Sequence, residues 1–116
     1  MTAREATIDK ETLRLIKQII LEESGKLGVK VEKIILFGSR ARGDYREDSD
    51  YDILIIVKEK PDAKRFIKLQ SRIRVRLYKT LRREIDLIII TKKRFEERRK
   101  LWGSLEQTAA EEGIPA

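Results

Sequence analysis

Two aspartates stand two residues apart at the head of an apolar run. Asp50 and Asp52 lead into residues 53–57, all of which are apolar. Residues two apart in a strand project from one face, with their backbones roughly 6–7 Å apart. Two ionised carboxylates at that spacing repel each other unless a cation lies between them, and ligation by oxygen alone suits Mg²⁺ or Mn²⁺ better than zinc. The pair indicates a divalent-cation site, with the solvent face of a half-buried strand as the alternative.

A third acid heads a second apolar run. Asp86 is followed by four apolar residues, 87–90. An acid embedded in a central strand is costly unless it is paired or bound to a metal. The unbroken apolar run after Asp52 also indicates a strand buried on both faces, which weighs against a plain solvent face. We therefore predict that Asp50, Asp52 and Asp86 form one metal-binding and catalytic site.

A glycine–serine pair lies eleven residues before Asp50. Gly38 permits close backbone approach, and backbone amides together with the Ser39 hydroxyl can cradle phosphate oxygens. Arg40 and Arg42 could neutralise the charge of a triphosphate, although a surface role fits either residue equally well. We therefore predict nucleotide binding by Gly38, Ser39, Arg40 and Arg42.

Helical and strand-like patterns alternate along the chain. The first helix is expected from Asp9, which is placed to cap it, to about Leu27. The other expected elements are strands over 31–37, 50–57 and 85–90, helices over 62–81 and 92–105, and a tail over 106–116. Phe95, Leu101 or Trp102, and Leu105 are expected to face inward.

This order of elements predicts the α/β (α+β) class. The expected fold is a small mixed sheet of three or more strands, with helices on one face and a site at the strand ends. We expect a single domain over 1–116, with a catalytic core over 31–90 and a C-terminal helix and tail over 92–116.

The composition excludes several chemistries. The chain has no Cys and no His, which excludes disulfides, thiolate or imidazole zinc sites and a Ser-His-Asp triad. The net charge is +7, and 15 of the 27 Lys and Arg residues fall between Lys64 and Lys100, with four acids. The helix over 62–81 carries a basic stripe of Arg65, Lys68, Arg72, Arg76 and Lys79, which fits either an anionic partner or a solvated face.

No targeting or membrane segment is expected. The N-terminus leads into a charged amphipathic stretch, and the longest apolar runs are strand-sized. A soluble, cytoplasmic protein with no membrane partner is therefore expected. Abundant Lys, Arg and Glu without Cys is typical of proteins from hot environments.

The combined motif resembles the DNA polymerase beta-like nucleotidyltransferase superfamily. Gly38-Ser39-Arg40-Ala41-Arg42-Gly43, then Ser49-Asp50-Tyr51-Asp52-Ile53 and a later acid, is similar to its minimal nucleotidyltransferase (MNT) branch, over roughly 34–90. The resemblance implies the polymerase beta-like fold and two Mg²⁺ ions, with Mn²⁺ as a substitute, on Asp50 and Asp52. It also implies that Asp86 ligates the second ion and takes the acceptor's proton, and that Gly38 and Ser39 hold the β- and γ-phosphates.

The resemblance further implies a partner. MNT proteins are commonly made beside a helical HEPN-type toxin, and the family activity is transfer of AMP from ATP to a tyrosine of that toxin. An antitoxin is therefore the first hypothesis. Two others stay open: a nucleotidyltransferase acting on an RNA end or a small molecule, and a non-catalytic binding antitoxin. A homo-oligomer also stays open.

Overall fold

The computed structural model describes residues 10–46 and 49–116, and its centre is a four-stranded sheet of order β3-β2-β1-β4. The strands are β1 (Val31–Phe37), β2 (Tyr51–Val57), β3 (Ile85–Thr91) and β4 (Ile114–Pro115). β2 is antiparallel to β1 and parallel to β3, and β4 is antiparallel to β1. The sheet is therefore mixed, and the predicted fold class is confirmed.

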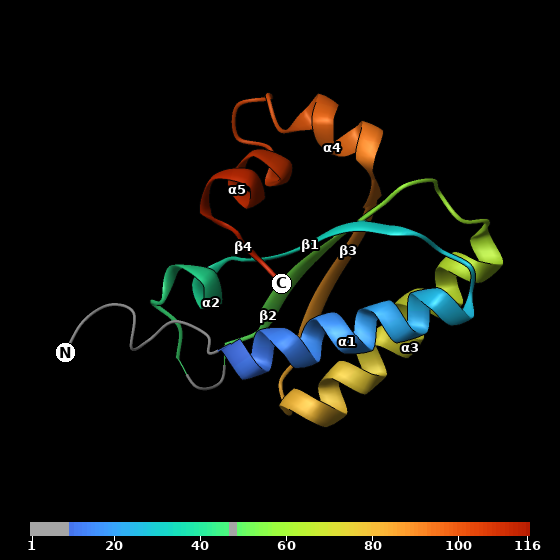
Figure 1. Ribbon diagram of the computed structural model, residues 1–116. Helices are drawn as coiled ribbons and strands as arrows, with labels where there is room; N and C mark the ends of the chain where they lie inside the picture. Colours follow the sequence, from blue (N-terminus) through green and yellow to red (C-terminus); the bar gives the residue numbers. More distant parts are fainter. Residues whose placement is uncertain (1–9, 47–48) are drawn as a thin grey trace.

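Two helices cover one face of the sheet (Figure 1). They are α1 (Lys10–Lys26) and α3 (Ala63–Leu81), and α3 forms the crossover between the parallel strands β2 and β3. Leu69, Ile73 and Leu77 of α3 are fully buried at the spacing expected of an amphipathic helix. Asp62 caps α3, since its carboxylate accepts a hydrogen bond from the Arg65 amide at 2.8 Å. The cap expected for the first helix, Asp9, lies outside the described residues.

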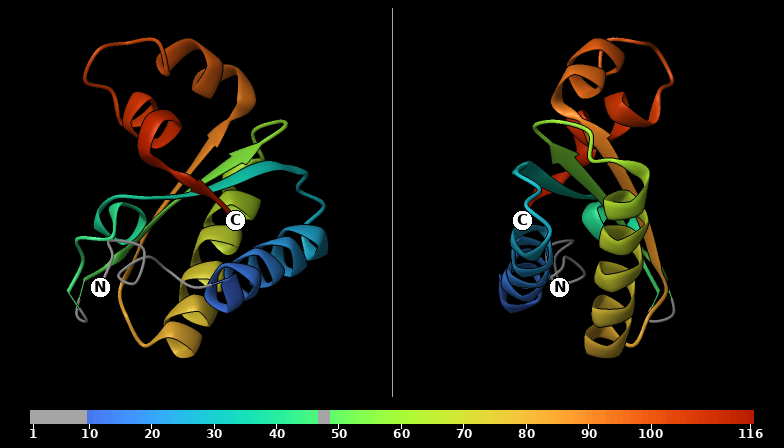
Figure 2. Two further views of the ribbon diagram at one scale, coloured as in Figure 1. Left: turned by 60° about the vertical axis from the view of Figure 1, so that its left-hand side comes forward. Right: turned by 90° about the vertical axis from the view of Figure 1, so that its right-hand side faces the viewer.

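The prediction of helices on one face only was wrong. α4 (Lys92–Arg98) and α5 (Leu105–Glu112) lie on the opposite face from α1 and α3, as both views in Figure 2 show. Their residues Phe95 and Ala109 pack with Ile35, Leu54 and Ile56. The reason is the apolar run in β2, because a central strand buried on both faces needs a covering layer on each.

The single helix predicted over 92–105 was also wrong. α4 ends at Arg98 and a new helix begins at Leu105. Gly103 adopts a positive φ of 78°, and the Ser104 hydroxyl accepts from the Gln107 amide to cap α5. This Gly-Ser pair thus reverses the chain and caps the second helix. Of the side chains expected inward, Phe95 is buried, whereas Leu101, Trp102 and Leu105 are exposed.

The short helix α2 (Ser39–Arg42) lies between β1 and β2. It occupies the end of the sheet at which β1 finishes and β2 and β3 begin. In the described ranges there is no helix of sufficient length and apolarity to cross a bilayer.

Candidate active site

Asp52 and Asp86 are direct neighbours on parallel strands. They are partners in the β2–β3 register, and Asp52 is also the partner of Phe37 at the end of β1. Paired strands lie about 4.8 Å apart, so the two carboxylates leave the sheet side by side. Asp50 immediately precedes β2. The structure thus pairs Asp52 with Asp86, and Asp50 precedes the same strand end.

The surroundings of Asp52 disfavour its ionised form. Burial raises the pKa of Asp52 to about 6, and the nearby Asp86 and Asp50 carboxylates add to the rise while Arg42 opposes it. A bound divalent cation would relieve this repulsion, and the donors present are all carboxylate oxygens, which suit Mg²⁺. Within 10–46 and 49–116, no three acidic side chains converge tightly enough to hold an ion as they stand. Asp50 and Asp86 are exposed, so both can rotate.

Gly38 lies against the Asp52 carboxylate. Its φ is 76°, and a Cβ atom at this position would overlap Oδ2 of Asp52. Both the conformation and the contact therefore require glycine. The next residue, Ser39, begins α2 beside the acids, and it is half-buried. This arrangement places the start of α2 beside Asp52.

The Arg40 side chain makes its contacts within the protein. Its side chain is buried, and its guanidinium donates to the Ser49 carbonyl through Nη2 at 2.9 Å and Nε at 3.3 Å. The same group stacks on the rings of Tyr45 and Tyr51, at 4.2 and 4.4 Å. Arg40 therefore holds the segment leading into Asp50, and this geometry favours a positioning role over contact with a triphosphate. Nothing in the sequence marked Tyr45 or Ser49 as its partners.

Arg42 is placed differently. It is half-exposed and forms ion pairs with Asp44 at 3.3 Å and Glu112 at 3.4 Å. It is also close enough to Asp52 to lower that carboxyl's pKa. A cation on the rim of an acidic site can turn toward an arriving phosphate. The link to Glu112 in α5 was not predicted, because 70 residues separate the two positions.

The polymerase beta nucleotidyltransferase family model matches residues 16–100, which contain the acids and the Gly38 turn. The chain belongs to this nucleotidyltransferase family. The family resemblance expected from the motif is thereby confirmed.

Two curated archaeal relatives match part of this nucleotidyltransferase. A Methanocaldococcus jannaschii protein, provisionally named protein adenylyltransferase MJ0141, is 48% identical over 65 residues, which are 53% of this chain and 66% of that protein. Protein adenylyltransferase MntA of Thermococcus cleftensis is 39% identical over 62 residues, 52% of this chain and 63% of MntA. The matches span less than two thirds of either relative.

Two solved structures share the nucleotidyltransferase fold. One, provisionally named a minimal nucleotidyltransferase, has a TM-score of 0.60 and 28% identity, and the match covers 94% of this chain and 97% of that one. The other is a toxin–antitoxin crystal structure with AMP-PNP, with a TM-score of 0.58 over 85% of this chain and 70% of that one. Its 21% identity supports likeness of fold alone.

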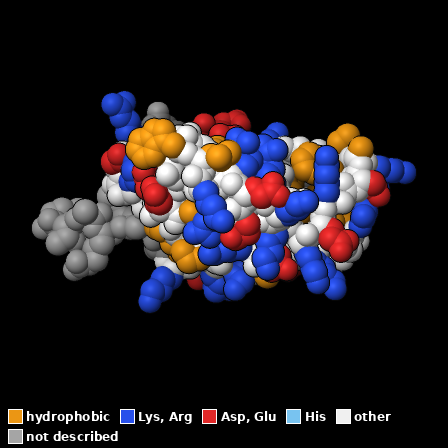
Figure 3. Space-filling view, turned by 90° about the horizontal axis from the view of Figure 1, so that it is seen from above, with side chains coloured by type: hydrophobic (Ala, Val, Ile, Leu, Met, Phe, Trp, Pro, Cys, Tyr) orange, Lys and Arg blue, Asp and Glu red, His pale blue; other side chains and the backbone are white. Residues whose placement is uncertain are grey.

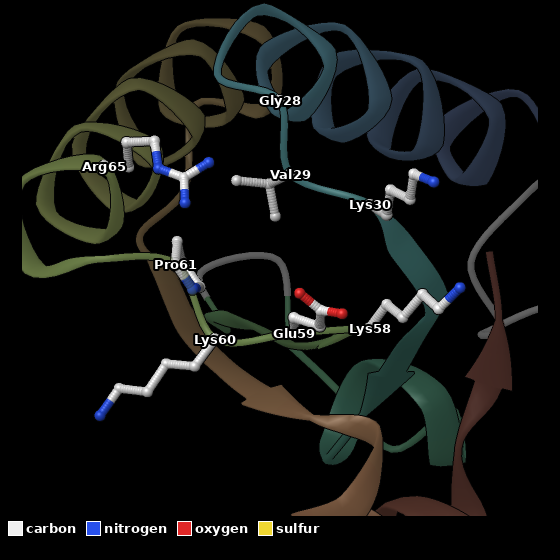
Figure 4. A pocket seen from close by; sticks show the side chains of 8 residues that line it. All are labelled: Gly28, Val29, Lys30, Lys58, Glu59, Lys60, Pro61 and Arg65. Atoms are coloured by element: carbon white, nitrogen blue, oxygen red, sulfur yellow. The ribbon is translucent and has the colours of Figure 1, made fainter.

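A basic pocket lies at the opposite end of the sheet from the acids (Figure 4). It encloses about 260 Å³ where β1 begins and β2 ends. The side chains of Lys30, Lys58 and Lys60 point away from it, while Glu59 and Arg65 face it. Arg65 already donates to Asp62 and to the Leu27 carbonyl. This pocket therefore lacks the converging cations that a phosphate needs.

The basic stripe of α3 is partly neutralised. Arg72 and Arg76 donate to the buried Glu23 of α1 at 2.9 and 2.8 Å, and Arg76 also pairs with Glu22. Two of the five cations therefore bind the helices to each other, and Arg65 is held by Asp62. The stripe is less available to steer a partner than its sequence suggested.

Proposed function

We propose that this nucleotidyltransferase transfers AMP from ATP to a tyrosine hydroxyl of a HEPN-type toxin and so acts as its antitoxin. The observation that carries the transferase chemistry is the Asp52–Asp86 register pair beside Gly38. The choice of a protein acceptor is supported by the names of the two archaeal relatives. The choice of a toxin is supported by the family resemblance of the motif, with a toxin–antitoxin complex among the structures of the same fold.

Asp50, Asp52 and Asp86 would hold Mg²⁺, as two ions or with Mn²⁺ in its place. Bound there, the metal would supply neutralisation of the triphosphate and a lower pKa for the acceptor hydroxyl. The clustered carboxylates and the raised pKa of Asp52 fit such a cation.

The remaining steps belong to this chain's own groups. Gly38 admits the β- and γ-phosphates to the backbone, and the Ser39 hydroxyl donates to them. Arg42 turns from Asp44 and Glu112 toward the same charge. The acceptor oxygen forms a bond to the α-phosphorus while the bond to pyrophosphate breaks, and Asp86 takes the hydroxyl proton. Orientation and charge neutralisation supply most of the rate.

The test is transfer of label to the product of the adjoining reading frame. The purified chain is incubated with that protein, Mg²⁺ and ATP labelled at the α- or the γ-phosphate. We expect label from the α-position only, on tyrosine, and its loss with Asp52→Asn or with chelator. Glu59→Gln, at the opposite end of the sheet, is the matched control and should label as wild type does.

Other outcomes separate the alternatives. Label appearing on RNA ends, with none on the protein, would make the chain an RNA nucleotidyltransferase. Binding and inhibition of the partner without any label, equal in wild type and Asp52→Asn, would make it a non-catalytic antitoxin. Transfer from the γ-position would refute nucleotidyl transfer.

A further inference from the structure

The turn between α4 and α5 presents the chain's sole tryptophan to solvent. Trp102 is 94% exposed, and Leu101 and Leu105 beside it are 50% and 37% exposed. We call residues 101–105 the Trp102 turn. A side chain of this size contributes most to stability when it is buried, and it is among the commonest anchors of protein interfaces. Its exposure therefore needs a structural explanation.

The turn is braced in this exposed form. The Ser104 hydroxyl donates to the Arg98 carbonyl at 2.7 Å, and the Gly103 amide donates to the Gln107 side chain at 2.8 Å. Two further amides close the turn, Leu101 to Arg98 and Ser104 to Leu101. Gly103 supplies the positive φ that the reversal requires. Hydrogen bonds on both sides of Trp102 thus hold the backbone that points it outward.

A buried acid fixes the base of the turn. Glu106 is 3% exposed and pairs with Arg98 at 3.3 Å and Arg94 at 3.5 Å, which ties the start of α5 to α4. The two helices flanking the turn therefore cannot move apart without breaking ion pairs to a buried carboxylate. Trp102 is presented on a preorganised support, which lowers the entropic cost of docking.

The charge around the turn selects the kind of partner. Residues 92–105 carry six Lys or Arg and two Glu. The face of α4 and α5 is correspondingly rich in cations, with hydrophobic side chains among them (Figure 3). A second copy of a chain of charge +7 would be repelled by such a surface. An apolar pocket rimmed by carboxylates on a different protein would complement it.

The turn is connected to the candidate active site through α5, which lies between the turn and α2 (Figure 1). α5 runs from Leu105, at the turn, to Glu112, whose carboxylate pairs with Arg42 of α2. A helix of eight residues is about 12 Å long. A protein seated on the turn would therefore extend over the three acids and could present a hydroxyl to them.

We propose that the Trp102 turn is the docking site for the acceptor protein, with Trp102 inserted into an apolar, acid-rimmed pocket of that partner. The proposal rests on the proposed function, since it takes the acceptor to be a protein. It assigns partner binding to the turn and chemistry to the acids, two places that can be altered independently.

The test measures association with the product of the adjoining reading frame. Trp102 is the chain's sole tryptophan, so its fluorescence reports on the turn directly. We expect the emission of wild type to shift to the blue on binding. Trp102→Ala should raise the dissociation constant, measured by calorimetry, roughly thirtyfold. Val75→Ala on α3, where the valine is 51% exposed on the other face, is the matched control and should bind as wild type does. ATP binding should be unchanged in both variants.

Each outcome decides the matter. Binding of Trp102→Ala with wild-type affinity, or binding of wild type without a shift in emission, would overturn the docking site and leave the transferase proposal standing. A Trp102-dependent complex in which no AMP is transferred would support the docking site and refute the transfer. No complex at all with wild type would overturn the docking site.

Discussion

Asp52 is crowded by Gly38 on one side and by Asp86 on the other. This crowding makes its ionised form costly until a cation arrives, and a metal-binding role accounts for the cost. The same crowding should make the free energy of unfolding depend on pH. A carboxyl with a raised pKa holds its proton more tightly in the folded chain than in the unfolded one.

The first prediction concerns Asp52→Asn without metal. Because the folded pKa of Asp52 is about 6 against an ordinary 3.8, the stabilisation from protonation is complete below pH 3.8 and is lost as the pH rises through 6. Asparagine cannot ionise and avoids this loss. We expect the variant to be more stable at pH 7 by about 1 kcal/mol, after allowance for the partial exposure of Asp52.

Chemical denaturation in chelator from pH 3.5 to 7.5 measures this difference. It should close below pH 4, and added Mg²⁺ should stabilise wild type only. If the difference in free energy of unfolding between the variant and wild type stays constant across that range, the pKa of Asp52 is not raised in the folded chain.

The second prediction compares two glycines of similar conformation. Gly38→Ala and Gly103→Ala both place a side chain at positive φ, at a cost of about 1 kcal/mol. The methyl at 38 also meets the Asp52 carboxylate, whereas nothing lies within 4 Å of the position at 103. We expect Gly38→Ala to abolish Mn²⁺ and ATP binding in calorimetry, and Gly103→Ala to preserve both. Equal binding by the two variants would remove Gly38 from the site.

The third prediction concerns Arg40. Lysine keeps the charge but cannot form the forked contact with Ser49 or stack between two tyrosine rings. Arg40→Lys should therefore weaken Mn²⁺ binding by about tenfold and speed hydrogen exchange of the Ser49–Tyr51 amides, with Arg42→Lys as the exposed control. Unchanged exchange would show that Arg40 does not hold this segment.

Among the elements, buried acids join the helices in pairs. Glu23 of α1 forms ion pairs with Arg72 and Arg76 of α3. Glu106 of α5 forms ion pairs with Arg94 and Arg98 of α4. Burial alone would raise the pKa of Glu23, but hydrogen bonds from Arg76 and Arg72 hold it below its usual value. Each pair of helices thus has an ionic contact beside its apolar one.

The fourth prediction separates two adjacent glutamates. Glu23 is 3% exposed and Glu22 is 45% exposed, although both meet Arg76. Glu23→Ala should lower the free energy of unfolding by about 2–3 kcal/mol, because it removes the charge-assisted hydrogen bonds from Arg72 and Arg76. Glu22→Ala should change it by less than about 0.5 kcal/mol. Thermal or urea unfolding followed by circular dichroism checks both, and similar losses would show that burial is not the cause.

The elements predicted well were those with a single strong period. The α3 helix follows from its amphipathic spacing, and the strands β1, β2 and β3 follow from their apolar runs. The C-terminal elements were missed because α4 ends at Arg98, within a run that the sequence pattern continues, and Ser104 caps a separate helix. The pairing of Ile114 with Leu36 is a long-range contact that no local pattern signals.

The sequence suggested which residues to consider for the candidate site, but it did not predict how they are arranged. Residue types alone pointed to the three acids and to Gly38. That Asp52 faces Asp86 depends on the parallel register of β2 and β3, which the 19-residue helix α3 sets. The role of Arg40 depends on which side of α2 is buried, and a four-residue helix has too little periodicity to reveal it.

For the whole molecule, the net charge of +7 is a poor guide to the binding surface. Charge reversal at Arg72 and Arg76 would not test steering cleanly, because both residues hold α1 to α3 through Glu23. Reversal there would destabilise the fold and confound any effect on association. Substitutions around the Trp102 turn test steering without that defect.

β3 has a further consequence at this scale. It lies at one end of the strand order, so its outer edge is not paired within the described sheet, and most of it is apolar. Such an edge can template strand addition between copies in concentrated or heated solution, the first step of aggregation. Asp86, exposed near the start of that edge, places a charge there that opposes stacking. We therefore expect the acid proposed for chemistry to oppose aggregation as well.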